Sequence, residues 1–309
     1  MIATSGSALA LLKLEFPSNR FFEIASYNVQ YSRSLILGLA LRTRSFLSAI
    51  DKEHEQLADI CKKEKVDYII SDNRYGCYHE RIPCAIITHQ LSIRASVLSP
   101  VVNYFNRKFI RRFNECWVPD TPGRKLSGGL SFSSRITPKF IGPLSRTTQT
   151  GHTLRSVEVL ALVSGPEPSR TALESLLQLE LPSSGVTYRM VRGIPVETQN
   201  FSENVFNHLP ANALSDMIRC SGVVISRPGY STIMDLAALR KKAIFIPTPG
   251  QTEQLYLAKE LQRKKIAPMY TQNQFSLKQA LRELENYTGF TGEYFDNTLL
   301  QRTLREFLG

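Results

Sequence analysis

The chain of 309 residues contains little cysteine, and no two cysteines form a CxxC pair. An odd number of unpaired cysteines argues against a disulfide framework and against a zinc site built from cysteine pairs. The five are Cys61, Cys77, Cys84, Cys116 and Cys220. This usage is typical of a reduced compartment, so we expect buried free thiols in a cytoplasmic protein.

Long hydrophobic runs are also missing. The longest apolar stretch, around residues 35–41, is far shorter than the roughly 20 residues that a membrane span needs. The run at residues 8–12 is too short for a signal-peptide core and has no basic lead-in. We therefore expect a cytoplasmic chain that at most lies on the inner face of the membrane.

The composition is nevertheless that of a folded protein, because 42% of the residues are hydrophobic and only 21% are charged. The charge is uneven: residues 1–150 carry a net charge of +9, and the remainder carries +2. A basic half favours an anionic partner such as lipid headgroups, phosphates or nucleic acid. A basic solvated surface without any partner is the alternative.

Short β-branched runs alternate with amphipathic stretches, which predicts parallel sheets covered by helices on both faces. A polar segment at residues 142–151 has no periodicity and reads as a linker. We therefore predict two domains, 1–145 and 146–309, the second ending in a helix. The expected strands are 66–71, 85–88, 157–163, 186–191, 223–226 and 243–247, and the expected helices include 48–64, 171–179, 230–240, 253–264 and 297–307.

Three strand-to-helix turns in the second half carry residues suited to a ligand. The first contains Ser164, Gly165 and Arg170, and a helix start with free N–H groups and a nearby cation attracts anions. Most turns of this kind bind nothing, so alone it is a weak signal.

The second turn combines a close-approach glycine, two hydroxyls and an acid one helical turn later, which suits a phosphate followed by a ribose. An ordinary capped helix is the competing interpretation. Its residues are Arg227, Gly229, Ser231, Thr232 and Asp235.

The third turn presents Gln251, Glu253 and Gln254, whose polar ends suit sugar hydroxyls, although a capped helix explains them as well. All three turns follow strands of one half, and open α/β sheets bind ligands at that edge. The combination is more specific than any single turn.

Residues 223–261 resemble the C-terminal domain of the bacterial peptidoglycan N-acetylglucosaminyltransferase family, which forms lipid II. The shared pattern is Arg-x-Gly-x-x-Thr-x-x-acid, a proline loop, and a glutamine before a helix. It stands here as Arg227, Gly229, Thr232, Asp235, Pro247 and Gln254. The resemblance implies the GT-B fold, two Rossmann-like domains facing across a cleft, together with a UDP-sugar donor and no metal or other cofactor.

The resemblance also implies individual roles. Residues 229–232 would face the diphosphate, Asp235 the ribose and Gln254 the donor sugar. Asp235 stands where the family usually has glutamate. Ala211 would lie near the uracil, and Arg146, in a segment similar to the family's Gly-Asn-Pro-Val-Arg junction, would reach the diphosphate. No Asp-x-Asp motif is present, which fits a diphosphate held by backbone and arginine.

The acceptor side is expected in the first half, where Asp72 and His89 each follow a predicted strand. Transfer to a hydroxyl needs a general base, and a carboxylate or an imidazole can serve. An Asx turn at Asp72 and a helix cap at His89 are the structural alternatives.

Residues 101–113 interleave apolar residues with Arg107, Lys108, Arg111 and Arg112. A basic amphipathic helix can lie on an anionic membrane surface, and the same pattern also describes a helix with one solvated face.

Taken together, the sequence predicts a metal-independent, inverting glycosyltransferase that moves an N-acetylhexosamine or hexose from a UDP-sugar to a lipid-linked or glycan acceptor, without nucleic acid as a partner. A UDP-sugar epimerase of the same fold and a non-catalytic nucleotide-sugar-binding subunit are the alternatives. The first domain is expected to lack its first strand, because residues 1–6 already read as the end of a second strand.

Overall fold

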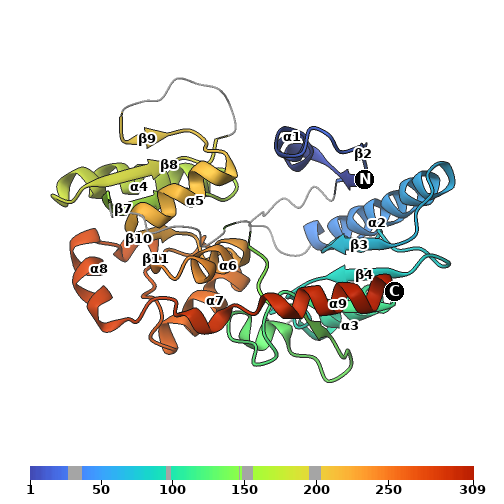
Figure 1. Cartoon of the computed structure of the whole chain (residues 1–309). Helices are drawn as coiled ribbons and strands as arrows, with labels where there is room; N and C mark the ends of the chain where they lie inside the picture. The colour runs from blue at the N-terminus through green and yellow to red at the C-terminus, as the bar shows by residue number, and fades with distance from the viewer. Residues whose placement is uncertain (27–36, 95–98, 146, 148–155, 195–202) are drawn as a thin grey trace.

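The structure is a computed structural model that describes residues 1–26, 37–94, 99–145, 147, 156–194 and 203–309. Figure 1 shows two larger parallel sheets and a separate two-stranded parallel sheet, with helices packed around them. The strands are β1 (Ile2–Thr4), β2 (Phe21–Glu23), β3 (Ile69–Asp72), β4 (Cys84–Ile87), β5 (Glu115–Val118), β6 (Lys139–Phe140), β7 (Val157–Leu162), β8 (Tyr188–Val191), β9 (Val205–Phe206), β10 (Ser221–Ser226) and β11 (Lys242–Phe245).

The α-helices cover the sheets and include every predicted helix, although the one expected at 48–64 begins at residue 37, and the helices at 211–220 and 277–283 were not predicted. They are α1 (Gly6–Glu15), α2 (Leu37–Lys63), α3 (Ser99–Ile110), α4 (Ser169–Ser183), α5 (Ala211–Cys220), α6 (Tyr230–Ala238), α7 (Thr252–Arg263), α8 (Leu277–Glu283) and α9 (Asn297–Leu308). None of the helices in the described part of the chain is long and apolar enough to span a membrane.

The second half contains a five-stranded parallel sheet in the order β11-β10-β7-β8-β9. Its central strands are nearly continuous apolar runs, because helices bury both faces of the sheet. Leu160 and Val224 on one face and Ala161 and Ile225 on the other are fully buried. This order makes β7, β10 and β11 neighbours, so the three turns that follow them share one edge.

The first half contains a four-stranded parallel sheet, β3-β4-β5-β6, and a separate parallel pair, β1 and β2. Within the described residues, β3 pairs only with β4, and β1 pairs only with β2. Arg74 links the two sheets, since it donates to Ser5 Oγ at 3.1 Å, to the carbonyl of Ala25 and to the buried carboxylate of Glu53. Strands β2, β5, β6 and β9 were not predicted from the sequence.

The last helix, α9, returns to the first half, as Figure 1 shows in red. Phe307 packs edge-on against Trp117 of β5 with ring centroids 5.2 Å apart, and Tyr68 donates to the carbonyl of Leu308 at 2.8 Å. The helix was grouped with the second half by chain order, but by its contacts it belongs with the first. It therefore joins the two halves.

Phe307→Ala should lower the free energy of unfolding by about 3 kcal/mol, since it empties a buried aromatic site. Trp117 is the only tryptophan of the chain, so its fluorescence reports this site during urea unfolding. The control is Leu308→Ala, which truncates an exposed neighbour and should change stability by less than about 0.5 kcal/mol. Equal losses in the two variants would contradict the packing of α9 on β5.

Candidate functional site

The site is built on the edge where β7, β10 and β11 end. Arg227, directly after β10, is buried and only 1% exposed. Its Nη1 donates to the carbonyls of Ile246 and Pro247 at 2.8 and 2.9 Å, and its Nη2 donates to the carbonyl of Ser169 at 2.8 Å. One side chain therefore ties together all three turns.

This contact set revises the role of Arg227, which was expected to touch the donor. Nη2 also donates to Gln272 Oε1 at 2.7 Å, so both Nη groups are engaged by protein acceptors. Burial lowers the pKa of Arg227 to about 10, which still leaves it charged at neutral pH. We therefore assign Arg227 a structural role: its hydrogen bonds hold the three turns together.

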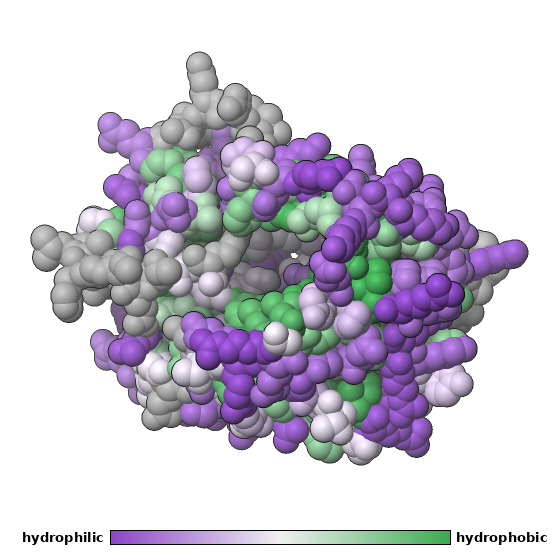
Figure 2. Space-filling view, turned by 45° about the vertical axis from the view of Figure 1, so that its right-hand side comes forward, coloured by the Kyte–Doolittle hydropathy of each residue, from purple (hydrophilic) through white to green (hydrophobic). Residues whose placement is uncertain are grey.

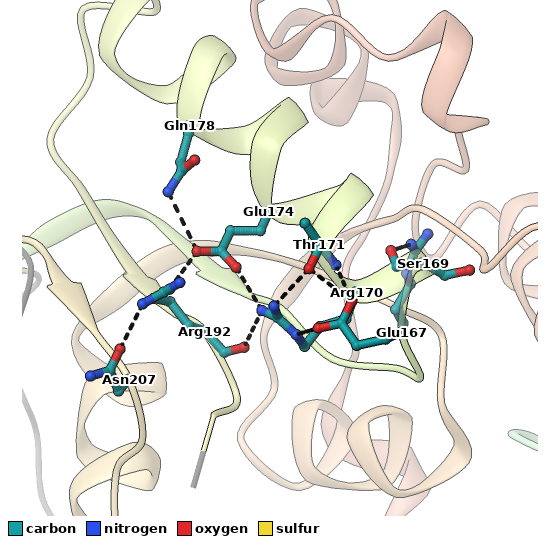
Figure 3. Close-up of polar contacts among 9 residues, drawn as sticks. Glu167, Ser169, Arg170, Thr171, Glu174, Gln178, Arg192 and Asn207 are labelled. Carbon is teal, nitrogen blue, oxygen red and sulfur yellow. Dashed lines mark hydrogen bonds and ion pairs between the residues drawn. The ribbon is translucent and has the colours of Figure 1, made fainter. Parts of the chain in front are cut away.

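Arg170, expected to bind an anion, is also occupied, as Figure 3 shows. Its Nε contacts Glu167 Oε1 at 2.5 Å, and its Nη1 contacts Glu174 Oε2 at 2.6 Å. The other oxygen of the buried Glu174 pairs with Arg192, which donates to Asn207 Oδ1 at 2.9 Å. Because two carboxylates balance Arg170, we revise its role to anchoring α4 against β8 and β9.

Three buried polar atoms at this edge have no hydrogen-bond partner among the described residues: Ser226 Oγ, Arg227 Nε and Thr248 Oγ1. A β-carbon placed on Gly165 would lie 3.7 Å from Thr248 Oγ1, so the first turn meets the third here. Unsatisfied buried polar groups are costly and rare. They mark a place where a polar ligand or water would complete the hydrogen bonding.

The other residues of the first two turns differ in burial and in their place relative to α6. Ser164 and Ser231 are exposed, Gly229 precedes the first turn of α6, and Thr232 is half-buried in that turn. The backbone N–H groups of a helix's first turn have no partner within the helix and so face outward. Ala211 begins α5, which follows the carboxyl end of β9 and therefore lies toward the same edge.

Asp235 lies where the second half meets the linker. Its Oδ1 accepts a hydrogen bond from Ser145 Oγ at 2.7 Å. Arg146, predicted to reach the diphosphate, lies outside the described residues. Ser145 was not singled out from the sequence, although its position beside Arg146 was a usable signal.

The third turn divides its side chains between the two halves. Gln254 Oε1 accepts from the amide of Thr248 at 2.8 Å, and Gln251 is the N-cap residue of α7. Glu253 turns the other way, toward the first half, where its Oε1 lies 2.7 Å from His89 Nε2 and its Oε2 accepts a hydrogen bond from Gln90 Nε2.

The acceptor-side residues of the first half lie close to each other. Asp72 ends β3 and His89 follows β4, and the two strands are neighbours in the sheet. Desolvation raises the pKa of Asp72, and the nearby charge of His89 partly lowers it. The His89 ring stacks on Tyr230 of α6, with centroids 3.9 Å apart and planes 10° apart. Tyr230 is a site residue that the sequence analysis missed.

Side chains from both halves therefore meet at one place. Figure 2 shows one face of the molecule hollowed near its centre, with hydrophobic residues on part of the wall. In the part of the chain that is described, no group of three or more His, Cys, Asp or Glu residues is arranged to hold a metal ion.

Comparison with known proteins finds similar sequences and structures. Residues 195–289 match the model of the glycosyltransferase family 28 C-terminal domain. The chain is 23% identical over 294 residues, 88% of this chain and 81% of the relative, to a UDP-N-acetylglucosamine--N-acetylmuramyl-(pentapeptide) pyrophosphoryl-undecaprenol N-acetylglucosamine transferase of Sulfurihydrogenibium sp. (strain YO3AOP1).

Solved structures show the same architecture. MurG of Acinetobacter baumannii matches 99% of this chain and 98% of its own length, with a TM-score of 0.55 and 14% identity. The calicheamicin glycosyltransferase CalG4 matches 99% of this chain and 86% of its own length, with a TM-score of 0.62 and 11% identity. The chain therefore has the GT-B fold, as the sequence predicted.

Proposed function

We propose that this chain, a glycosyltransferase with the GT-B fold and a family 28 C-terminal domain, transfers an N-acetylhexosamine from a UDP-sugar to a lipid-linked or glycan acceptor without a metal ion. One observation carries the proposal. Three turns lie at one sheet edge, and unsatisfied buried polar atoms belong to the second and third of them. Through Glu253, this edge meets the turn of the opposite half that carries His89 and Gln90, here called the acceptor-side turn.

The donor half supplies the elements that a departing diphosphate needs. The first turn of α6 directs backbone N–H groups outward, and the positive end of a helix stabilises an anion. Gly229, without a side chain, lets a phosphate approach the backbone. Asp235, one turn later, is the residue proposed to accept hydrogen bonds from the ribose hydroxyls.

The acceptor half supplies a base. In the proposed reaction, an acceptor hydroxyl oxygen forms a bond to the anomeric carbon as the bond from that carbon to the diphosphate breaks. His89 or Asp72 accepts the hydroxyl proton, and UDP leaves with the electron pair. Attack opposite the leaving group gives inversion.

A membrane-bound acceptor is favoured by the surface of α3. Val101, Tyr104 and Phe105 are 56%, 57% and 40% exposed at helical i, i+3 and i+4 spacing, which forms an apolar stripe beside Arg107 and Lys108. Such a stripe with flanking cations fits a lipid surface. Arg111 and Arg112 contribute less, because Arg111 donates to the carbonyl of Arg135 and Arg112 lies over the Tyr78 and Phe109 rings.

The same helix fastens the acceptor-side turn. Asn106 donates to the carbonyl of Gln90 at 2.7 Å, and Asn103 exchanges hydrogen bonds with both backbone groups of Ile93. A helix lying on a membrane would therefore hold the turn that carries His89 close to a lipid-linked acceptor.

The function is tested by incubating the chain with labelled UDP-N-acetylglucosamine and N-acetylmuramyl-(pentapeptide) pyrophosphoryl-undecaprenol. We expect labelled lipid product, unchanged by EDTA, and no product from donor alone. Epimer or free sugar from donor alone would indicate an epimerase or hydrolase. Calorimetry against UDP-, GDP- and TDP-sugars finds the donor class, and binding without turnover on any acceptor would indicate a non-catalytic subunit.

Asp235→Ala should weaken UDP binding by about 1.5–3 kcal/mol, the range for hydrogen bonds to a charged group. Calorimetry on the folded variant measures this. Ser145→Ala is the matched control, because it removes the 2.7 Å hydrogen bond to Asp235 while leaving the carboxylate in place. Unchanged affinity in Asp235→Ala, or equal losses in both variants, would refute ribose binding by Asp235.

Arg107→Ser/Lys108→Ser should weaken binding to phosphatidylserine-containing vesicles by about 2 kcal/mol, roughly thirty-fold, since each cation at such a surface contributes about 1 kcal/mol. Co-sedimentation at low salt measures this, and high salt should abolish the binding. The control Lys62→Ser/Lys63→Ser removes two exposed cations from α2 instead. Equal losses would mean that charge alone, and not α3, drives adsorption.

A further inference from the structure

The carboxylate of Glu253 connects the two halves at the acceptor-side turn. It lies in the first turn of α7, in the donor half, and its Oε1 is 2.7 Å from His89 Nε2. Its second oxygen accepts from Gln90 Nε2. Both carboxylate oxygens therefore contact side chains of the first half, although Glu253 belongs to the turn that was expected to hold the donor sugar.

A second donor-half residue fixes the same imidazole. Tyr230 stacks on the ring of His89, and its hydroxyl donates to the carbonyl of Pro119 in the first half at 2.9 Å. The stacked tyrosine restrains the plane of the ring, and the carboxylate restrains its rotation within that plane. The His89 side chain is 17% exposed, so solvent still reaches part of it.

The chemistry of imidazole gives this arrangement a consequence. A neutral imidazole carries one N–H, and the hydrogen bond made by one nitrogen decides which nitrogen bears the proton. A proton on Nε2 that donates to Glu253 leaves Nδ1 as the basic nitrogen. A general base works only when its free nitrogen is correctly aimed.

We propose that Glu253 is a positioning residue for His89: it holds the imidazole in the Nε2–H form and presents Nδ1 as the base that accepts the acceptor proton. This inference rests on the proposed transferase function for the role of His89, but the contact itself does not. Since Glu253 and His89 belong to opposite halves, the oriented base exists only while the halves are in contact. It also reassigns Glu253 from binding donor sugar to orienting the base.

The tautomer of His89 is measured by NMR of the ¹⁵N-histidine-labelled chain at about pH 8.5, above the ordinary imidazole pKa of about 6.5. The chain has five histidines, and the signals lost in His89→Gln identify the relevant one. We expect the Nε2–H pattern in the wild-type chain and a tautomer mixture in Glu253→Ala. Glu253→Gln, whose amide oxygen can still accept, should largely restore the wild-type pattern.

Lys259→Ala, on the exposed side of the same helix, should leave the His89 signals unchanged. Identical His89 signals in the wild-type chain and in Glu253→Ala would overturn the proposal, as would an Nδ1–H pattern in the wild-type chain. This readout needs no substrate, so it remains decisive even if the transfer assay shows no activity.

Kinetics with labelled UDP-N-acetylglucosamine separate orienting the base from binding the sugar. A positioning role predicts that Glu253→Ala lowers kcat at least about ten-fold, as part of the roughly 10²–10⁴-fold that general-base catalysis contributes, while the donor KM stays within about two-fold. Adding Glu253→Ala to His89→Ala should cause no further loss. A raised donor KM with unchanged kcat would contradict the proposal and indicate that Glu253 binds the donor sugar.

Discussion

The site depends on the hydrogen bonds that the buried guanidinium of Arg227 donates to the surrounding turns. A charge removed from water is costly unless hydrogen bonds compensate, and here three backbone carbonyls and a glutamine oxygen do so. Those acceptors belong to segments that follow different strands. The turns after β7, β10 and β11 therefore cannot move independently, and their polar atoms stay aimed at one place. The remaining unpartnered atoms lie where such a fixed frame would receive a ligand.

Directional contacts also fix how the two halves meet. Tyr256 of α7 accepts a hydrogen bond from the amide of Gly129 at 2.7 Å, and Arg94 lies 4.1 Å above the Tyr256 ring. Lys264 donates to the carbonyl of Lys125 at 2.8 Å. These contacts join side chains of the donor half mostly to the backbone of the acceptor half. They set the register in which α7 faces the acceptor-side turn, and they complement the docking of α9.

Two arginines show where reasoning from local sequence goes wrong. A cation beside a helix start suggests anion binding, yet Arg170 has carboxylates three residues before it and four residues after it, a helical spacing that was visible in the sequence. The sequence around Arg227 contains no comparable pattern of nearby carboxylates. Its acceptors include Gln272, 45 residues away, and main-chain carbonyls that no sequence pattern marks. Burial of a charged side chain is a property of the packed molecule.

The sequence by itself determined the strand–helix alternation, the three polar turns and the resemblance that predicted the GT-B fold, because these depend on periodicity and local spacing. It also placed Asp72 and His89 at strand ends, since parallel neighbours end at one edge. Only the tertiary structure decided which side chains meet across the halves. The pairing of Glu253 with His89 spans 164 residues, and the stacking of Tyr230 on His89 depends on how two domains pack. Contacts at such separation depend on shape and burial, which no local pattern encodes.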